Sequence, residues 1–513
     1  MKYIQGQNRT QTHLFPISLD ESIDTNNEVR FIDVFVDSLN LSNFGFKVDF
    51  EENGRPAYHP SDLLKLYIYG YLNSIRSSRK LEKETKRNIE LMWLLKNLTP
   101  DHNTISNFRR DNPKSIKKVF RATVQIAKNF DLIGGKLIAG DSTKFRAQNS
   151  KKNNFNAKKI DRHITYIDKK LSQYEKELSE SDCDNTSLIK EEIAKHEERK
   201  KNYKALQQEL DDTGESQIST SDPESRHMIT RNNITEVAYN TQTTVDEKNN
   251  IPIDYKVTNA NDSKAMGNML RRAKTILRTN NFTSLYDKGY HTGSEFKTAN
   301  DLGIDVMVAI PTVAVNAPDT AYNVEHFIYD KKEDCYICPQ GEELHTTGTW
   351  HKAKTYRFKR YTTKACLKCT VKNQCSKAKY GKGIQRSEYQ EYINQNKERI
   401  ENSKDYYRKR QAIVEHPYGT IKRQWGFNYI ITKKFIKRAE ADVGLIFIAY
   451  NLRRLISIIG IEVLKEYLKI VISLLLSLLQ SIRLKISHFK KSKFIEIIEQ
   501  AFFNHVLKRL IFG

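Results

Sequence analysis

Apolar residues recur at helical spacing in the first quarter of the chain. Between Leu63 and Leu72 they fall three and four positions apart, after a Pro60-Ser61-Asp62 start that can cap a helix. The same helical pattern of apolar residues extends from about residue 13 to about residue 130. This pattern predicts a mainly helical N-terminal region.

Short apolar runs bounded by polar residues predict strands farther along the chain. Residues 137–141 form one run that ends on Asp141, and residues 282–287 form a second that ends on Asp287. Residues 234–245 and 251–257 are β-like and flank a turn-rich segment, which predicts a hairpin. Residues 305–311 predict a further buried strand. We therefore expect an α/β fold with a mixed sheet.

Two other stretches have helical patterns of a different kind. Residues 151–215 contain two charged helices with apolar residues at alternating spacings of four and three, which predicts an antiparallel hairpin. It is interpreted as a solvated arm, with dimerisation or DNA gripping as the alternative role. The pattern of the last 70 residues predicts strongly apolar helices. Their longest apolar run, Ile470 to Ile482, has 13 residues, too few to cross a bilayer, and predicts a buried helix.

Composition narrows the class of protein. The chain has 513 residues, enough for about three domains, and 38% of them are hydrophobic, so a single small module and a disordered chain are excluded. The formal net charge is +23, from 85 Lys and Arg against 62 Asp and Glu. Such an excess favours a polyanionic partner, most commonly nucleic acid. No signal-peptide pattern opens the chain, so we expect a cytoplasmic protein.

Three acids form the candidate catalytic site. Asp141 and Asp287 each end a predicted strand, and Glu415 lies within a strongly basic helical stretch. Carboxylates that converge from separate elements need a cation between them, and hard oxygen ligands favour Mg²⁺ or Mn²⁺. Two such ions can activate the attacking oxygen and stabilise the leaving oxygen of phosphoryl transfer. The three acids therefore predict metal-dependent chemistry on phosphodiesters.

A series of motifs in fixed order resembles the DDE transposases of bacterial insertion sequences, in the branch with a helical N-terminal domain and a Tyr, Arg, Glu, Lys signature. The motifs are Leu14-Phe15-Pro16, His59-Pro60, Pro100-Asp101-His102, Gly140-Asp141-Ser142-Thr143, Ser221-Asp222-Pro223-Glu224-Ser225-Arg226, Asp287-Lys288-Gly289-Tyr290 and Val414-Glu415-His416-Pro417-Tyr418-Gly419-Thr420-Ile421-Lys422. The resemblance implies an RNase H-like catalytic core in which Asp141, Asp287 and Glu415 are the metal-binding triad. It also implies that Lys422 contacts DNA near the cleavage site.

The signature departs from the family pattern by one position. The family places an Arg four residues before the Glu and a Tyr three residues before that Arg, whereas this chain has Gln411 and Arg408 there. Tyr407 and Arg410 keep the Tyr-to-Arg spacing one residue early, and we take them as the corresponding DNA contacts.

Paired arginines predict a second contact with DNA. Arg109 and Arg110 end a helix that begins near Pro100, an arrangement suited to reaching phosphates. The alternative is a solvated basic helix.

Cysteines cluster in one segment. Cys335 and Cys338, and Cys366 and Cys369, form two Cys-x-x-Cys pairs, and Cys375 follows. Four soft ligands at this spacing fit a structural Zn²⁺ held by Cys335, Cys338, Cys366 and Cys369, with Cys375 as an alternative fourth ligand. Unliganded thiols in a loop-rich insertion are the other interpretation.

Together these patterns predict a domain order and a function. We expect a helical DNA-binding domain at 1–130, an RNase H-like catalytic domain at 131–460 with a helical arm at 151–215 and a cysteine-rich insertion at 320–400, and C-terminal helices at 461–513.

The expected activity is transposition. The enzyme would bind the terminal inverted repeats of an insertion sequence, cleave double-stranded DNA with Mg²⁺ or Mn²⁺, and join the 3′-OH ends to target DNA, as a homodimer in a bacterial cytoplasm. A catalytically silent DNA-binding derivative and an RNase H-like nuclease without strand transfer are the alternatives.

Overall fold

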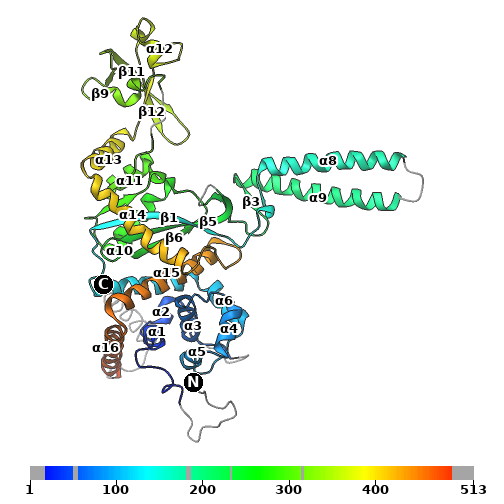
Figure 1. Ribbon diagram of the computed structural model, residues 1–513, viewed down its shortest axis with the longest axis vertical. Helices are drawn as coiled ribbons and strands as arrows, with labels where there is room; N and C mark the ends of the chain where they lie inside the picture. The colour runs from blue at the N-terminus through cyan, green and yellow to red at the C-terminus, as the bar shows by residue number, and fades with distance from the viewer. Residues whose placement is uncertain (1–17, 50–55, 181–185, 231–233, 313–316, 488–513) are drawn as a thin grey trace, which may run out of the picture.

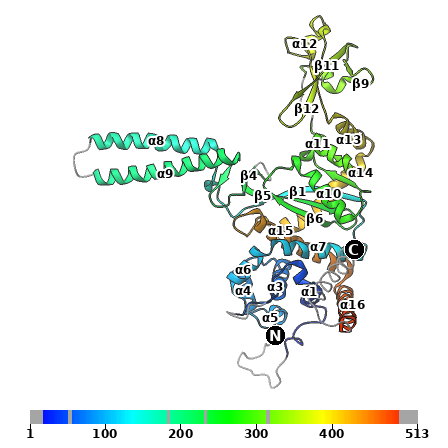
Figure 2. The ribbon, with the colours of Figure 1, turned by 180° about the vertical axis from the view of Figure 1, so that it is seen from behind.

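The computed structural model describes residues 18–49, 56–180, 186–230, 234–312 and 317–487. Its centre is a mixed sheet that lies between a helical region and a smaller cysteine-containing lobe, while a long helical hairpin projects to one side (Figures 1 and 2). The N-terminal segment 1–17, residues 50–55 and the C-terminal segment 488–513 lie outside the described residues, as does Cys183.

Seven helices build the helical region. They are α1 (Glu28–Asp37), α2 (Leu41–Phe44), α3 (Pro60–Leu72), α4 (Ser78–Thr85), α5 (Ile89–Leu94), α6 (His102–Asp111) and α7 (Pro113–Asn129). Proline occupies the first position of α3 and of α7, where its missing N–H costs no hydrogen bond. Helix α3 is buried along almost its whole length, so the helical N-terminal region predicted from the sequence is confirmed.

The central sheet mixes parallel and antiparallel strands. Its strands are β1 (Leu137–Arg146), β4 (Arg226–Ile229), β5 (Thr235–Asp246), β6 (Ile251–Thr258), β7 (Thr283–Tyr286) and β8 (Asp305–Val308). They run in the order β4-β5-β1-β7-β8, and β6 pairs with the later part of β5, after the residues that pair with β4. The β5–β6 pair is antiparallel and is the predicted hairpin. Strand β7 runs parallel to β1, and β8 runs parallel to β7. The chain is therefore a mixed α/β protein.

Helices on both sides fix the sheet. α10 (Met266–Leu277) and α11 (Gly293–Asp301) connect its strands, and α13 (Gln390–Asn402) and α14 (Lys404–Tyr418) return to it from the lobe. At the end of β8 the Asn396 amide exchanges two hydrogen bonds, of 2.8 and 2.9 Å, with the backbone of Val308. The basic stretch before Glu415 forms two helices joined at Ser403.

Helix α15 (Ile436–Ile459) joins the sheet to the helical region, since it packs against β6 on one side and against α7, α3 and α6 on the other (Figure 1). A side chain at Gly444 would lie 2.4 Å from the Tyr255 hydroxyl and 2.9 Å from Ile116, so only glycine permits this close approach. Asp222 and Glu224 accept hydrogen bonds from the backbone of Phe435 and Ile436 at the start of α15. These two acids therefore cap a helix, as negative charges do favourably at helix N-termini.

A buried carboxylate holds this junction together. Asp442 on α15 is fully buried and lies 2.6 Å from the guanidinium of Arg76 and 3.8 Å from that of Arg109. It also accepts hydrogen bonds from the Tyr71 hydroxyl and, at 2.7 Å, from the backbone N–H of Ile431. Burial alone raises the pKa of a carboxyl, but the two arginines hold the pKa of Asp442 below its ordinary value.

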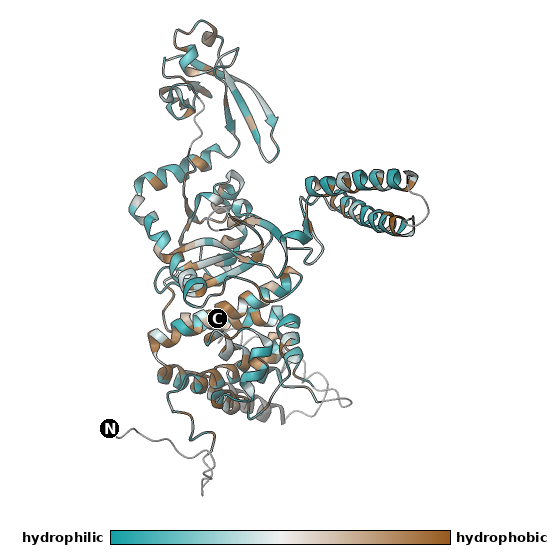
Figure 3. Ribbon diagram, turned by 45° about the vertical axis from the view of Figure 1, so that its right-hand side comes forward, coloured by the Kyte–Doolittle hydropathy of each residue, from teal (hydrophilic) through white to brown (hydrophobic). Residues whose placement is uncertain are grey.

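Two helices form the projecting arm. α8 (Ala157–Glu180) and α9 (Thr186–Thr213) lie side by side and carry mostly hydrophilic residues (Figure 3). Where the arm meets the sheet, a small apolar cluster of Phe155, Ile160, Leu210 and Ile218 packs beside the two-stranded sheet of β2 (Asn154–Phe155) and β3 (Ile218–Ser219). The arm therefore has a small apolar core at its base, and Ile167 is a further buried residue on α8.

The cysteine lobe follows β8. We use this name for the five-stranded antiparallel sheet and its loops, in the order β13-β12-β11-β10-β9. Its strands are β9 (Ile328–Asp330), β10 (Cys335–Ile337), β11 (Glu343–Lys352), β12 (Arg357–Thr362) and β13 (Ile384–Ser387), and it includes the short helix α12 (Lys372–Cys375).

The last described element is α16 (Ile461–Ser487), which contacts α1 and α15. The sequence predicted a buried helix over Ile470 to Ile482. The helix is present, but the burial was wrong, because Ile470, Leu474 and Leu476 are each more than half exposed. Apolar residues occur around the whole circumference here, and no described element covers the outer face. Among the described helices, none is long and apolar enough to span a membrane.

The Asp442 network generates the first prediction. Asp442→Asn should lower the free energy of unfolding by about 3–5 kcal/mol, because it leaves two buried guanidinium groups without their counter-charge. Urea unfolding at neutral pH measures this loss. Since the folded pKa is depressed, the wild-type contribution should be present above the ordinary carboxyl value of about 3.9 and fade as pH falls below it.

The matched control is Asp301→Asn, which removes an exposed ion pair with Lys297. It should cost less than about 1 kcal/mol. Equal small losses for both variants would contradict a stabilising role for the buried pair.

Candidate active site

Two of the three predicted acids come from neighbouring parallel strands. In the β1–β7 pair Ala139 lies opposite Leu285, so that Asp141 and Asp287 each follow two residues later. Asp287 comes directly after β7, where its side chain accepts the backbone N–H of Lys288 at 2.5 Å. Asp141 does not end its strand as expected, because β1 continues to Arg146 through its pairing with β5. The strand register therefore brings the two carboxylates to one edge.

A glycine allows this arrangement. A Cβ on Gly140 would lie 2.0 Å from the ring of Tyr286, which fills the space beside β1. Gly140 directly precedes Asp141, and Tyr286 directly precedes Asp287. Any larger residue at Gly140 would displace Tyr286 and, with it, the backbone that carries Asp287.

Helix α14 brings a cation to the same place. The Arg410 guanidinium lies 3.3 Å from the Asp141 carboxylate, and both side chains are largely buried, with exposures of 11% and 22%. The Tyr407 hydroxyl donates to the carbonyl of Tyr286 at 3.1 Å. The structure thus places Tyr407 and Arg410, the displaced members of the signature, beside the two acids.

The electrostatics of Asp141 reflect this crowding. Burial raises the pKa of its carboxyl above the ordinary value, and Arg410 acts in the opposite direction. The negative charges of Asp287 and Asp262 add to the rise. A bound cation would favour the ionised form in the same way that Arg410 does.

Glu415 lies on α14, five positions after Arg410, and is exposed. Its neighbours Ile413 and Val414 pack into an apolar cluster with Leu137, Ala139 and Leu285, so this turn of the helix lies over β1 and β7. In the described part of the chain, however, no three His, Cys, Asp or Glu side chains lie close enough together to hold a metal ion. The structure brings Asp141 and Asp287 together without completing the site with Glu415.

Asp262 is an acid beside the site that the sequence did not single out. Its carboxylate lies 3.2 Å from the Lys144 ammonium and accepts hydrogen bonds of 2.7 and 2.6 Å from the amides of Asn240 and Gln242. These partners outweigh burial and lower the pKa of Asp262. The available sequence signal was only its place before the helical run that starts at Ser263.

The segment after Glu415 is tied to β1. Lys422 lies in a short π-helical stretch, η8 (Gly419–Gln424), where its ammonium donates to the carbonyl of Lys144 at 2.7 Å and lies 5.0 Å from the ring of Phe145. The Tyr418 hydroxyl lies 3.3 Å from the carbonyl of Asp141. Lys422 therefore contacts β1 at Lys144, three residues after Asp141.

Comparison with known families adds an independent finding. Residues 17–111 match a family model described as a transposase domain (DUF772), and residues 337–456 match one described as a transposase DDE domain. Together the two matches support a DDE transposase of an insertion sequence. The second match includes Glu415 and Lys422, whereas Asp141 and Asp287 lie between the two matched regions. No curated protein matches the chain.

The structure separates the two arginines that were predicted to reach DNA. In the transposase Arg109 is only 4% exposed and donates to the Tyr71 hydroxyl at 3.0 Å and to the carbonyl of Arg76 at 3.2 Å. Its guanidinium belongs to the Asp442 network and is not accessible to a phosphate. Arg110 is 42% exposed and pairs with Asp111 at 2.6 Å. Adjacent helical residues point in different directions, which explains the difference.

The described cysteines of the transposase are also divided. Cys335 is buried within β10, whereas Cys338, Cys366, Cys369 and Cys375 line one cavity. None of the five described cysteines forms a disulfide.

The Arg410–Asp141 pair generates the second prediction. Because Arg410 holds positive charge where a divalent cation would bind, Arg410→Met should strengthen Mg²⁺ binding in the absence of DNA by about three- to tenfold. Titration calorimetry at pH 8 measures the affinity. Arg408→Met is the matched control, since Arg408 lies on the same helix, is 77% exposed and pairs with Asp405. Unchanged or weaker binding in Arg410→Met alone would contradict competition for this position.

Proposed function

We propose that the transposase binds the terminal inverted repeats of its element, cleaves the DNA by divalent-metal-dependent hydrolysis and joins the freed 3′-OH to target DNA. The observation that carries the proposal is the register of β1 and β7, which places Asp141 and Asp287 side by side in a chain of the DDE family. The proximity of Tyr407 and Arg410 to the same two acids supports it.

In its second step, the proposed reaction forms one phosphodiester bond for each one that it breaks. In hydrolysis, a water oxygen bonds to phosphorus and the 3′ oxygen of the element leaves with a proton. In transesterification, that 3′-OH bonds to a phosphorus of target DNA, and the target 3′ oxygen leaves with the proton. No covalent enzyme intermediate and no oxidant or reductant is required.

Asp141, Asp287 and Glu415 would hold Mg²⁺ or Mn²⁺, which prefer carboxylate oxygens. A bound cation would activate the attacking oxygen and stabilise the leaving oxygen. The donor set suits this role because Asp141 is crowded by other acids and is already paired with a cation, Arg410. Asp262, held by Lys144 and two amides, contributes negative charge beside the site without being one of the three proposed ligands.

We further propose that the central sheet is the RNase H-like core of a catalytic domain spanning 131–460, between a helical DNA-binding domain and the C-terminal helices. The mixed sheet and the return of α14 across β1 and β7 support this division. Lys422, Arg410 and Tyr407 would contact DNA next to the triad, and Arg110 would contact it from the helical region. Action as a homodimer on DNA stays a prediction.

The third prediction tests the triad. Asp141→Ala, Asp287→Ala and Glu415→Ala should each reduce cleavage of element-end DNA in Mg²⁺ by at least about a hundredfold, because each removes a proposed metal ligand. Binding to the same DNA should change less than about threefold, since affinity comes mainly from Lys and Arg on phosphates. A gel assay of cleavage and fluorescence anisotropy measure the two properties.

Asp405→Ala is the control for Glu415→Ala, because Asp405 lies on the same helix but is 93% exposed and pairs only with Arg408 among the described ion pairs. It should cleave like wild type. Robust cleavage by any triad variant would remove that residue from the site. Cleavage without joining of a pre-cut 3′-OH end would favour a nuclease, and DNA binding without metal-dependent cleavage would favour a silent derivative.

The fourth prediction concerns the basic surface. With a net charge of +23, the transposase should lose at least about a hundredfold in DNA affinity when salt rises from 50 to 200 mM, because phosphate contacts release counterions. Anisotropy in EDTA measures binding without cleavage. A nearly flat response would contradict phosphate contacts as the main source of affinity.

A further inference from the structure

The loops of the cysteine lobe lack an adequate apolar core. Five buried side chains hold its sheet, namely Phe327, Tyr336, Leu344, Tyr361 and Ile384. The segments beyond the sheet, around residues 338–342 and 364–383, contribute none of these five. Small lobes with so little buried apolar surface are commonly stabilised by a metal or by disulfides.

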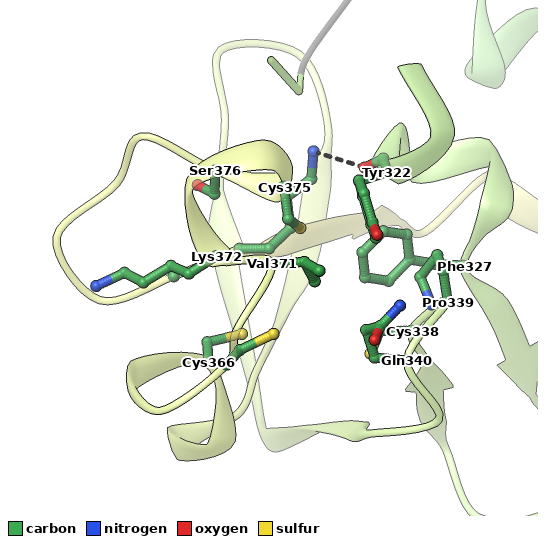
Figure 4. Close-up of a pocket in the computed structure, with 13 residues that line it drawn as sticks. Tyr322, Phe327, Cys338, Pro339, Gln340, Cys366, Val371, Lys372, Cys375 and Ser376 are labelled. Carbon is green, nitrogen blue, oxygen red and sulfur yellow. Dashed lines mark hydrogen bonds between the residues drawn. The ribbon is translucent and has the colours of Figure 1, made fainter. Parts of the chain in front are cut away.

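Four cysteines from three segments surround one cavity of about 30 Å³ at this place. Cys338 lies in the turn after β10, Cys366 and Cys369 lie in and after η7 (Lys364–Leu367), and Cys375 ends α12. Figure 4 shows Cys338, Cys366 and Cys375 around a common space, next to Phe327 and Val371. Thiols separated by up to 37 positions in sequence therefore face the same interior.

The turn at Cys338 is shaped for a sulfur ligand. The backbone N–H of Glu342 donates to Cys338 Sγ at 3.3 Å, while the backbone of Cys338 bonds to Gly341 and Glu342 at 2.8 and 2.9 Å. Gly341 has a φ of +83°, which closes this tight turn. An N–H directed at sulfur stabilises negative charge on it, as a metal-bound thiolate requires.

A second close contact positions Cys366. A Cβ on Gly381 would lie 2.2 Å from Cys366 Cβ and 2.9 Å from its sulfur, and Gly381 has a φ of +92°. The loop can therefore approach Cys366 only because this residue is glycine. One glycine turn thus lies directly against the Cys366 thiol, and a second glycine closes the turn that carries Cys338.

Cys335 is placed differently from these four. It is 1% exposed within β10, pairs across the sheet with Asp330 and His345, and does not line the cavity. Cys335 and Cys338 form a Cys-x-x-Cys pair in the sequence, but the fold places only Cys338 at the cavity.

We propose that Cys338, Cys366, Cys369 and Cys375 bind one structural Zn²⁺, with Cys375 in place of Cys335. Four thiolates suit tetrahedral Zn²⁺ better than any hard cation, and a site closed by four protein ligands is structural. The thiols line the cavity without being gathered at ligand distance in the described structure, so binding would draw the three segments together. The proposal is independent of the proposed active site.

Metal analysis of the purified full chain, prepared without chelators, tests the ligand set. Wild type should contain about one zinc per chain. Cys338→Ser, Cys366→Ser, Cys369→Ser and Cys375→Ser should each retain less than about a tenth of it. Cys335→Ser is the matched control and should keep the metal. Zinc-free wild type, or loss of zinc from Cys335→Ser with retention in Cys375→Ser, would overturn the proposal.

A second measurement covers variants whose lobe fails to fold. Replacing zinc by Co²⁺ in wild type and in Cys335→Ser should give the intense thiolate-to-metal absorption of a four-sulfur site, and Cys375→Ser should not give it. Limited proteolysis should cut wild type within 320–400 only after the metal is removed. Disulfides among the four cysteines in the freshly purified chain, or proteolysis unchanged by metal removal, would overturn the proposal.

Discussion

The ion network around Asp442 determines how the helical region and the sheet of this transposase are arranged. A buried carboxylate is tolerated only with its charge balanced, and here the balance comes from Arg76 and Arg109, which belong to the helical region. Arg76 also donates to the carbonyl of Tyr429 at 2.8 Å, on the segment that follows Lys422. One network therefore ties the N-terminal helices to the chain that leaves the active site, and the position of α15 depends on it.

The candidate active site depends on a second constraint, the close packing of β1, β7 and α14. The register of the parallel strands aligns Asp141 with Asp287, and Gly140 leaves room for the Tyr286 ring beside β1. Tyr407 and Tyr418 then bond to backbone carbonyls of these two strands. These contacts with backbone atoms fix α14 relative to β1 and β7.

Local patterns predicted the elements well, whereas long-range contacts decided what the sequence missed. The β5–β6 hairpin, the α8–α9 arm and the strands at Asp141 and Asp287 follow from periodicity within short windows. Arg109 was predicted to lie on a surface because its partner Asp442 is remote in the sequence. Arg76, the other arginine paired with Asp442, is 366 positions away from it. Asp262 lies near Asp141 because β5, which binds Asp262, pairs with β1. The exposure of Leu474 depends on which elements pack against α16. Cys375 was named from the sequence as an alternative to the four paired cysteines, but spacing alone did not show that loop folding places it, and not Cys335, at the cavity.

The Arg410–Asp141 pair offsets the crowding of negative charge around Asp141. Burial and the neighbouring acids favour protonation of Asp141, and an arginine at 3.3 Å offsets both effects. Arginine remains charged at any physiological pH, so it can balance the site before metal binds. The same residue lies on the helix that carries Glu415, so displacement of Arg410 by a divalent cation would act on the element that presents the third acid. In the proposed site, charge balance and the position of Glu415 would thereby be coupled through α14.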